Sequence, residues 1–196
     1  MPKVTEAHRA ARREEIIDAA VRCVLRDGYR GVSIASVIQE SGLSAGAIYG
    51  HFVNKQELLV AVAERVLDGR VADLAAAQRR NGPLSPGELL VALIDGLRHE
   101  DVSAAIPQVW AEAAFDDDVR AVAERIFGRV RGILRTELVA WATASPGRVD
   151  GDAEEWADLV TPVVLAAVPG FLVQRAILRN FDEAAYLRAL PVAYRR

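Results

Sequence analysis

The fold of this chain is decided by the segment VSIASVIQESGLSAGAIYGHFVNK, residues 32–55. Ser33 stands where a helix N-cap belongs, directly before an apolar pattern over residues 34–38. Gly42 interrupts that pattern, and Ser44 is placed to cap a second short helix. Helix, glycine-containing turn and helix is the sequence form of a helix-turn-helix, whose second helix normally enters the major groove of DNA.

A helix before this motif is predicted over residues 12–27. Ile16, Ala20 and Val24 recur every four residues, which gives this helix one apolar side for packing on the helix-turn-helix. Gly28 follows at the position where helices commonly end. Cys23 lies on the helix and is interpreted as a small core residue. A redox sensor is the less favoured alternative, because the chain has one cysteine and no Cys-x-x-Cys pair.

Residues 1–11 are predicted to form a flexible arm, and Arg9, Arg12 and Arg13 lie close together at its end. Two interpretations of these arginines stay open. They could contact DNA phosphate or the minor groove, or they could belong to the solvated, frayed start of a helix.

The segment around the motif resembles the DNA-binding domain of TetR-type transcriptional regulators. The matching pieces are the Ser-Gly-Leu-Ser turn (41–44), the Gly-Ala-Ile-Tyr helix (46–49), Tyr49-x-His51-Phe52 and Asn54-Lys55. Arg13-Glu-Glu-Ile-Ile-Asp-Ala-Ala and Asp27-Gly28-Tyr29 extend the match, so that it covers about residues 12–60. The resemblance implies a DNA-binding domain over residues 1–54 and a ligand-binding and dimerisation bundle over residues 55–196.

The resemblance also implies which residues contact DNA, and the chemistry of these residues agrees with that role. Backbone N–H groups at the start of the second helix attract an anion, and hydroxyl, phenol, imidazole and ammonium groups suit phosphate. Core packing is the alternative for Tyr49 and the preferred interpretation for Phe52. Arg30, in the loop after the first helix, is a further candidate contact. The implied DNA-binding residues are Ser33, Ser44, Ala45, Gly46, Ala47, Tyr49, His51 and Lys55.

The predicted recognition helix departs from the family pattern at three positions. Members of the family often carry Lys or another long polar residue at position 45, Thr at position 47 and a large residue at position 50. This chain has Ala45, Ala47 and Gly50 there. Since arginine and glutamine are the usual bidentate readers of bases, we expect readout to depend on thymine methyl groups, on DNA shape, and on residues outside this helix such as Arg30 or Gln39.

Composition indicates an all-α protein. Apolar residues make up 52% of the 196, and runs of Val and Ile with period two are scarce. The formal net charge is −3, but residues 1–60 carry eight basic and seven acidic side chains whereas residues 61–196 carry sixteen and twenty. The positive end is therefore the motif end, as a DNA-binding protein requires. The polar N-terminus and the lack of an uncharged apolar run of about 18 residues predict a cytoplasmic protein without signal peptide or membrane span.

Six further helices are predicted beyond the motif, for about nine in total. The first is long and would link the two domains, and a loop rich in Gly and Pro at residues 81–87 follows it. The predicted ranges are 54–78, 86–98, 103–115, 117–144, 152–180 and 183–194.

Large aromatic side chains on three of these helices suggest an effector pocket. The resemblance implies that the C-terminal bundle encloses a small-molecule site, and Trp110, Phe127 and Phe171 are its candidate lining residues. Pro162 and Pro169 are expected to kink helix 152–180, which would widen the bundle interior. Residue by residue, simple filling of the core remains the preferred alternative.

The last two predicted helices carry more apolar residues than a small bundle has faces to bury. This surplus suggests self-association, most simply as a two-fold homodimer, and the resemblance implies a four-helix interface. The candidate interface residues are Val164, Val168, Leu172, Leu187 and Leu190.

An enzyme is not expected. Asp116, Asp117 and Asp118 could suggest a metal site, but they are better interpreted as acids at a helix N-terminus. The three histidines are scattered, and neither a Ser-His-Asp set nor a phosphate-binding glycine loop is present. No metal and no cofactor are therefore predicted.

These patterns together predict a cytoplasmic, homodimeric, DNA-binding transcriptional regulator, most simply a repressor on a near-palindromic double-stranded operator. A small hydrophobic effector would shift the dimer toward a spacing that no longer fits DNA. Two alternatives remain: a non-inducible DNA-binding dimer with a filled core, and a small all-α enzyme.

Overall fold

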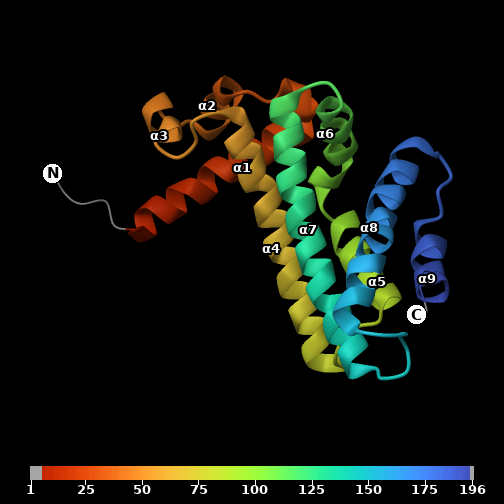
Figure 1. Ribbon diagram of the computed structural model, residues 1–196. Helices are drawn as coiled ribbons and strands as arrows, with labels where there is room; N and C mark the ends of the chain where they lie inside the picture. Colours follow the sequence, from red (N-terminus) through yellow and green to blue (C-terminus); the bar gives the residue numbers. More distant parts are fainter. Residues whose placement is uncertain (1–5, 195–196) are drawn as a thin grey trace. The chain divides into compact units, whose positions relative to one another are not determined.

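The computed structural model describes residues 6–194, apart from the side chains of residues 101 and 102. Over this range the chain is helical and contains no strand, which confirms the predicted all-α class. The elements are labelled in Figure 1. They are α1 (Glu6–Gly31), α2 (Ile34–Ser41), α3 (Ala45–Tyr49), α4 (Lys55–Asn81), α5 (Pro86–Arg98), the 3₁₀ helix η1 (Asp101–Ala105), α6 (Ile106–Ala113), α7 (Asp117–Ala144), α8 (Ala153–Ile177) and α9 (Glu183–Ala193).

Two compact units are present, and they do not follow the predicted division after residue 54. The first unit contains residues up to Arg65 together with Gln108–Ala123, and the second contains Val66–Pro107 and Glu124–Arg196. The first unit thus combines α1 to α3 and the start of α4 with α6 and the start of α7. The division into a DNA-binding domain over residues 1–54 and a bundle over residues 55–196 stays a prediction.

The first unit is built around the apolar side of α1. Ile16, Ile17, Ala20 and Val24 are buried, as the four-residue spacing predicts, and α2 packs against this helix. Cys23 is also fully buried, which agrees with its interpretation as a core residue.

The helix α1 starts earlier than predicted. Residues 6–11 are helical, so the predicted flexible arm was wrong over that part, while residues 1–5 lie outside the described residues. The physical reason is composition: Ala, Arg and Glu are strong helix formers, and no Gly or Pro follows residue 6 until Gly28. The Arg12–Glu15 ion pair at 2.7 Å adds a favourable (i, i+3) contact.

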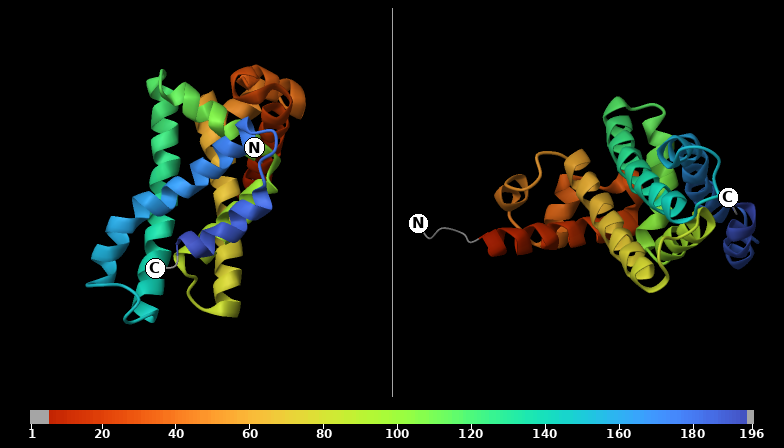
Figure 2. Two further views of the ribbon diagram at one scale, coloured as in Figure 1. Left: turned by 90° about the vertical axis from the view of Figure 1, so that its right-hand side faces the viewer. Right: turned by 60° about the horizontal axis from the view of Figure 1, so that its bottom comes forward.

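The second unit contains α5, α8 and α9, which lie side by side (Figure 2). Its core is made of large apolar side chains that are fully buried, among them Leu89, Leu90, Ile94, Leu134, Leu138 and Phe171. Gly87 permits close packing of α5 on α9, because a Cβ there would lie 2.5 Å from Cα of Pro191.

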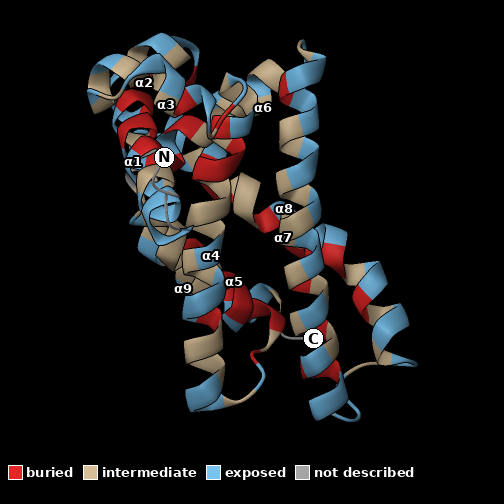
Figure 3. Cartoon of the chain, turned by 90° about the vertical axis from the view of Figure 1, so that its left-hand side faces the viewer, coloured by how far each residue is buried: buried red, intermediate tan, exposed pale blue. Residues whose placement is uncertain are grey.

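The apolar helix α8 runs without interruption through Pro162 and Pro169. By length and hydropathy it is the one described helix that could cross a membrane, although only 33% of that window is buried inside the protein. Figure 3 shows buried and exposed residues alternating along it. One apolar side of α8 therefore serves the core, and a second apolar side is left uncovered.

We expect Gly87→Ala to lower the free energy of unfolding by about 1–3 kcal/mol, because the added methyl group would overlap backbone atoms of Pro191 and Leu190. Gly132→Ala is the matched control in α7, where a Cβ meets no atom within 4 Å, and it should stabilise by about 0.5–1 kcal/mol. Urea unfolding followed by circular dichroism measures both. Equal effects of the two substitutions would contradict the close packing of α5 on α9.

Candidate nucleic-acid interface

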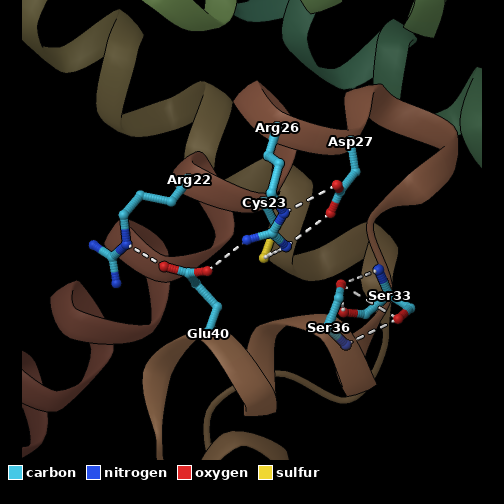
Figure 4. Close-up of polar contacts among 7 residues, drawn as sticks. All are labelled: Arg22, Cys23, Arg26, Asp27, Ser33, Ser36 and Glu40. Carbon is cyan, nitrogen blue, oxygen red and sulfur yellow. Dashed lines mark hydrogen bonds and ion pairs between the residues drawn. The ribbon is translucent and has the colours of Figure 1, made fainter.

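The start of α2 is fixed by a capping box. Ser33 Oγ accepts a hydrogen bond from the backbone N–H of Ser36 at 3.0 Å, and Ser36 Oγ accepts one from the N–H of Ser33 at 2.9 Å. Figure 4 shows these two serines together. Ser33 is thus the predicted N-cap, and its exposed side chain lies at the end of the helix where an anion is favoured.

The turn between α2 and α3 requires glycine. Gly42 has φ +69° and ψ +8°, in the left-handed region, and its N–H donates to the carbonyl of Ile38 at 3.0 Å. Val37 of α2, before the turn, and Ile48 of α3, after the turn, are both fully buried. The turn and these two apolar anchors together set the direction of α3.

The helix α3 is capped by Ser44, as predicted, but one of its N–H groups is not free for an anion. The N–H of Ala47 donates to Ser44 Oγ at 3.2 Å and to the Ser44 carbonyl at 3.0 Å. The N–H of Ala47 is therefore occupied by the cap. Because the Ser44 cap uses this N–H, an anion at the start of α3 can bind only the N–H groups that precede Ala47.

The exposed side of α3 is formed by small residues and one tyrosine. Ala45 and Gly46 are exposed, Ala47 is partly exposed, and 55% of Tyr49 is exposed. Phe52 is only 2% exposed, in agreement with the core role preferred for it. This small-residue surface allows backbone atoms of α3 to approach a groove closely, which is what major-groove insertion requires.

Cationic residues of α1 surround His51. Burial lowers the pKa of this imidazole, and the nearby positive charges of Arg9, Arg13 and Arg12 lower it further. Arg13 also lies over the Phe52 ring, 5.3 Å from its centroid. The first turns of α1 therefore bring positive charge close to the end of α3, and contact of these arginines with DNA stays a prediction.

Lys55 is engaged inside the first unit rather than extended into solvent. Its Nζ donates to the carbonyl of Tyr29 at 2.7 Å and lies 4.3 Å from the centroid of the Tyr29 ring. Burial lowers the pKa of the Lys55 ammonium. Arg30, the further predicted contact, pairs with Glu112 at 2.7 Å.

Sequence reasoning missed an ion network that ties α1 to α2. Glu40 accepts from Arg22 Nε at 2.7 Å and from Arg26 Nη1 at 2.7 Å, as Figure 4 shows. These two guanidinium groups lower the pKa of the Glu40 carboxyl group. Arg22 and Arg26 are four residues apart on one face of α1, which is a signal for a shared partner, but the sequence does not identify Glu40 as that partner.

The predicted effector-pocket residues are divided between the two units. Trp110 belongs to the first unit, whereas Phe127 and Phe171 belong to the second. Phe171 is fully buried, with the rings of Phe181 and Tyr186 at centroid distances of 5.5 Å and 5.4 Å.

The predicted interface residues are mostly turned inward. Val164, Leu172 and Leu190 are buried in the core of the second unit, and Val168 and Leu187 are partly exposed. The side of α8 that remains exposed carries other residues, among them Leu159, Val163 and Ile177.

The acidic run before α7 is a helix cap. Asp116 Oδ1 accepts from the backbone N–H groups of Asp118 at 2.9 Å and Val119 at 3.1 Å. Within residues 6–194, no group of three His, Cys, Asp or Glu side chains is placed to hold a metal ion.

Comparison with known proteins places this motif in a family. The model of the bacterial regulatory proteins of the tetR family matches residues 16–62. The HTH-type transcriptional repressor AcnR of Corynebacterium jeikeium is 30% identical over 94% of this chain and 93% of its own length. The HTH-type transcriptional repressor Rv1474c of Mycobacterium tuberculosis is 41% identical, but over only 40% of this chain and 41% of that protein.

A solved structure supports the fold of the whole chain. The putative transcriptional regulator of Saccharomonospora viridis, determined in complex with choline, superimposes with a TM-score of 0.66 over 93% of this chain and 95% of that one. Sequence identity between the two is 22%.

The lowered pKa of His51 predicts proton-linked DNA binding. A phosphate beside Arg9, Arg12 and Arg13 would offset their charge and raise the His51 pKa, so that binding takes up a proton and DNA affinity increases as pH falls from 8 to 6. For one proton the change is at most about tenfold per pH unit. Fluorescence anisotropy at constant ionic strength measures it.

The control for this prediction is His51→Gln, in which the part of the pH dependence due to His51 should disappear. The same pH dependence in both proteins would remove His51 from the phosphate contacts.

Proposed function

Because the chain belongs to the TetR family of bacterial regulatory proteins, it is a DNA-binding transcriptional regulator and not an enzyme, and we propose that it is a ligand-responsive, homodimeric repressor. The observation that supports DNA binding most directly is the capped helix-turn-helix, in which Ser44 begins an exposed recognition helix of small residues. Such a regulator acts on the bacterial chromosome, which lies in the cytoplasm.

We infer that phosphate contacts surround a sparse base-reading surface. The candidate contacts are the residues that the family resemblance implies, together with Arg9, Arg12 and Arg13 at the His51 end of α3. The exposed Ala45 and Gly46 offer no bidentate hydrogen-bonding group. Specificity would then depend on methyl contacts with thymine and on DNA shape, whereas affinity comes from phosphate and depends on salt.

Dimerisation is supported by an uncovered apolar stripe on α8. Leu159, Val163, Ala166, Gly170, Val173 and Ile177 follow one another at alternating spacings of four and three residues, which is the spacing of a helix–helix seam. Leu159 is 76% exposed, Val163 62% and Ile177 71%. A second copy would cover this stripe, so the proposed interface lies on the opposite side of α8 from the buried Val164 and Leu172.

Ligand response is supported by the shared fold. The regulator of Saccharomonospora viridis, whose fold is similar, has been determined in complex with choline. A ligand that binds the two states of the dimer with different affinities would shift the population away from DNA binding.

A non-inducible regulator is the second candidate, and one observation favours it. Phe171, Phe181 and Tyr186 pack mutually at centroid distances of 5.4–5.6 Å, and the Tyr186 hydroxyl donates to the carbonyl of Ala167 at 2.8 Å. Around Phe171, aromatic rings thus fill space that a ligand would otherwise need.

The test is binding to DNA from directly upstream of the protein's own gene, measured by anisotropy at two salt concentrations with an unrelated duplex as control. We expect tight, salt-sensitive binding that is selective for the upstream duplex. Small molecules that release the complex would support the inducible form. Operator binding that persists in the presence of a broad set of organic cations, acids and neutral lipophiles would support the non-inducible form. Equal affinity for both duplexes would contradict autoregulation, that is, control of the protein's own gene.

Val163→Arg is expected to convert the dimer to a monomer and to weaken operator binding at least tenfold, because it places a charge in the proposed seam. Sedimentation velocity measures the assembly. Ala140→Arg, at an exposed position of α7, should remain dimeric. Leu172→Arg should instead unfold the protein, because Leu172 is 3% exposed. A Val163→Arg variant that stays dimeric would exclude this face of α8.

A further inference from the structure

The helix α6 lies against the end of α1 through two polar side chains. Gln108 Oε1 accepts from the backbone N–H of Tyr29 at 3.1 Å and occupies the space beside Gly28, where a Cβ would be only 2.8 Å away. One turn further along α6, Glu112 faces the same segment of α1. This short helix, about 80 residues away in sequence, therefore belongs to the unit that carries the DNA-binding motif.

The carboxylate of Glu112 engages Arg30 through one oxygen. Glu112 Oε2 accepts from Arg30 Nε at 2.9 Å and from Nη2 at 2.7 Å. The Arg30 side chain is nevertheless 82% exposed, whereas that of Glu112 is 25% exposed. The arginine thus lies on the outside of the pair, and its remaining N–H groups face solvent.

The same carboxylate acts on Lys55. The Lys55 ammonium is held at the Tyr29 carbonyl, and burial lowers the Lys55 pKa, an effect that the negative charge of Glu112 partly offsets. Burial raises the pKa of the Tyr29 hydroxyl, and the negative charges of Asp116 and Glu112 raise it further. One carboxylate of α6 thus pairs with Arg30 and acts on Lys55 through its charge alone, and both cations are candidates for DNA phosphate.

We propose that Glu112 is an internal counter-charge that occupies Arg30 and lowers the affinity of the protein for DNA. Exposed ion pairs of this kind are weak, so a phosphate group, which binds arginine with two parallel hydrogen bonds, can displace the carboxylate. The displaced carboxylate of Glu112 then also competes less with phosphate for the neighbouring Lys55. This inference rests on the proposed placement of Arg30 and Lys55 at the DNA backbone.

The decisive variant is Glu112→Gln, which keeps the shape of the side chain and removes its charge. We expect it to bind DNA about three- to tenfold more tightly at low salt, on operator and unrelated duplexes alike, because phosphate contacts carry no sequence information. The slope of log affinity against log salt concentration should stay unchanged, since Arg30 engages the same phosphate in both proteins. Anisotropy titrations at four salt concentrations measure both quantities.

Asp118→Asn is the matched control. It removes the same unit of charge from an exposed residue of the same unit. Its effect on DNA affinity should be clearly smaller than that of Glu112→Gln. Equal gains in the two variants would show a general charge effect and would overturn the specific role of Glu112.

Arg30→Gln completes a double-mutant cycle, and the single variant tests the role of Arg30 even where a Glu112 variant does not fold. Arg30 is highly exposed, so its replacement should leave thermal unfolding unchanged while it weakens DNA binding and reduces the salt slope by about one. In the double variant, most of the gain from Glu112→Gln should be lost. An unchanged slope in Arg30→Gln, or weaker DNA binding by Glu112→Gln, would overturn the proposal in favour of a purely structural pair. If the natural protein does not prefer the operator over unrelated DNA, that result counts against autoregulation only. The role of Glu112 is still tested, because the cycle is also measured on unrelated DNA.

Discussion

The first unit depends on the break in α1 at Gly28 and Tyr29. Gly28 adopts φ +67°, which a side chain would strain, and the chain therefore leaves the helical path at this residue. The two backbone polar groups of Tyr29 are then bound by different helices, its N–H by Gln108 of α6 and its carbonyl by Lys55 of α4. Since buried peptide groups are costly to leave unpaired, these two hydrogen bonds fix the place at which α2 can begin. The orientation of the whole helix-turn-helix follows from this turn.

Local signals in the sequence were sufficient for the motif itself. The serine caps at Ser33 and Ser44 and the left-handed Gly42 were predictable, because each is a local requirement of a helix end. The starts of α5 and α7 were predictable for the same reason, and both lie where the sequence predicts them. The contact between Tyr29 and Gln108 was not predictable, because 79 residues separate its partners and neither has a pattern that identifies the other. The early start of α1 follows from the helix propensity of residues 6–11, which outweighs the repulsion among the positive charges near the start of the helix.

The proposed dimer seam on α8 illustrates a different limit of sequence reasoning. The helix α8 is apolar on nearly every side, so periodicity could not distinguish the face that packs in the core from the face left outside. The structure separates them: Thr161, Val164 and Phe171 point inward, and Leu159, Val163 and Ile177 are exposed. A surplus of apolar residues was thus a correct signal for a second apolar face, but the assignment of residues to that face required the three-dimensional packing.

The charged residues around the motif fall into two groups with different consequences for DNA binding. Glu40 accepts from two arginines of α1 at once, so loss of either contact would loosen the packing of α2 on α1. The pairs of Arg12 with Glu15 and of Arg30 with Glu112 do not hold the recognition helix in place, and exposed pairs of this kind contribute little stability. Phosphate can therefore compete for Arg12 and Arg30 at small cost, whereas Arg22 and Arg26 are committed to the fold. If these arginines lie at the DNA backbone as proposed, a chain with a net charge of −3 can bind a polyanion in this way, because DNA would meet arginines held only in weak pairs.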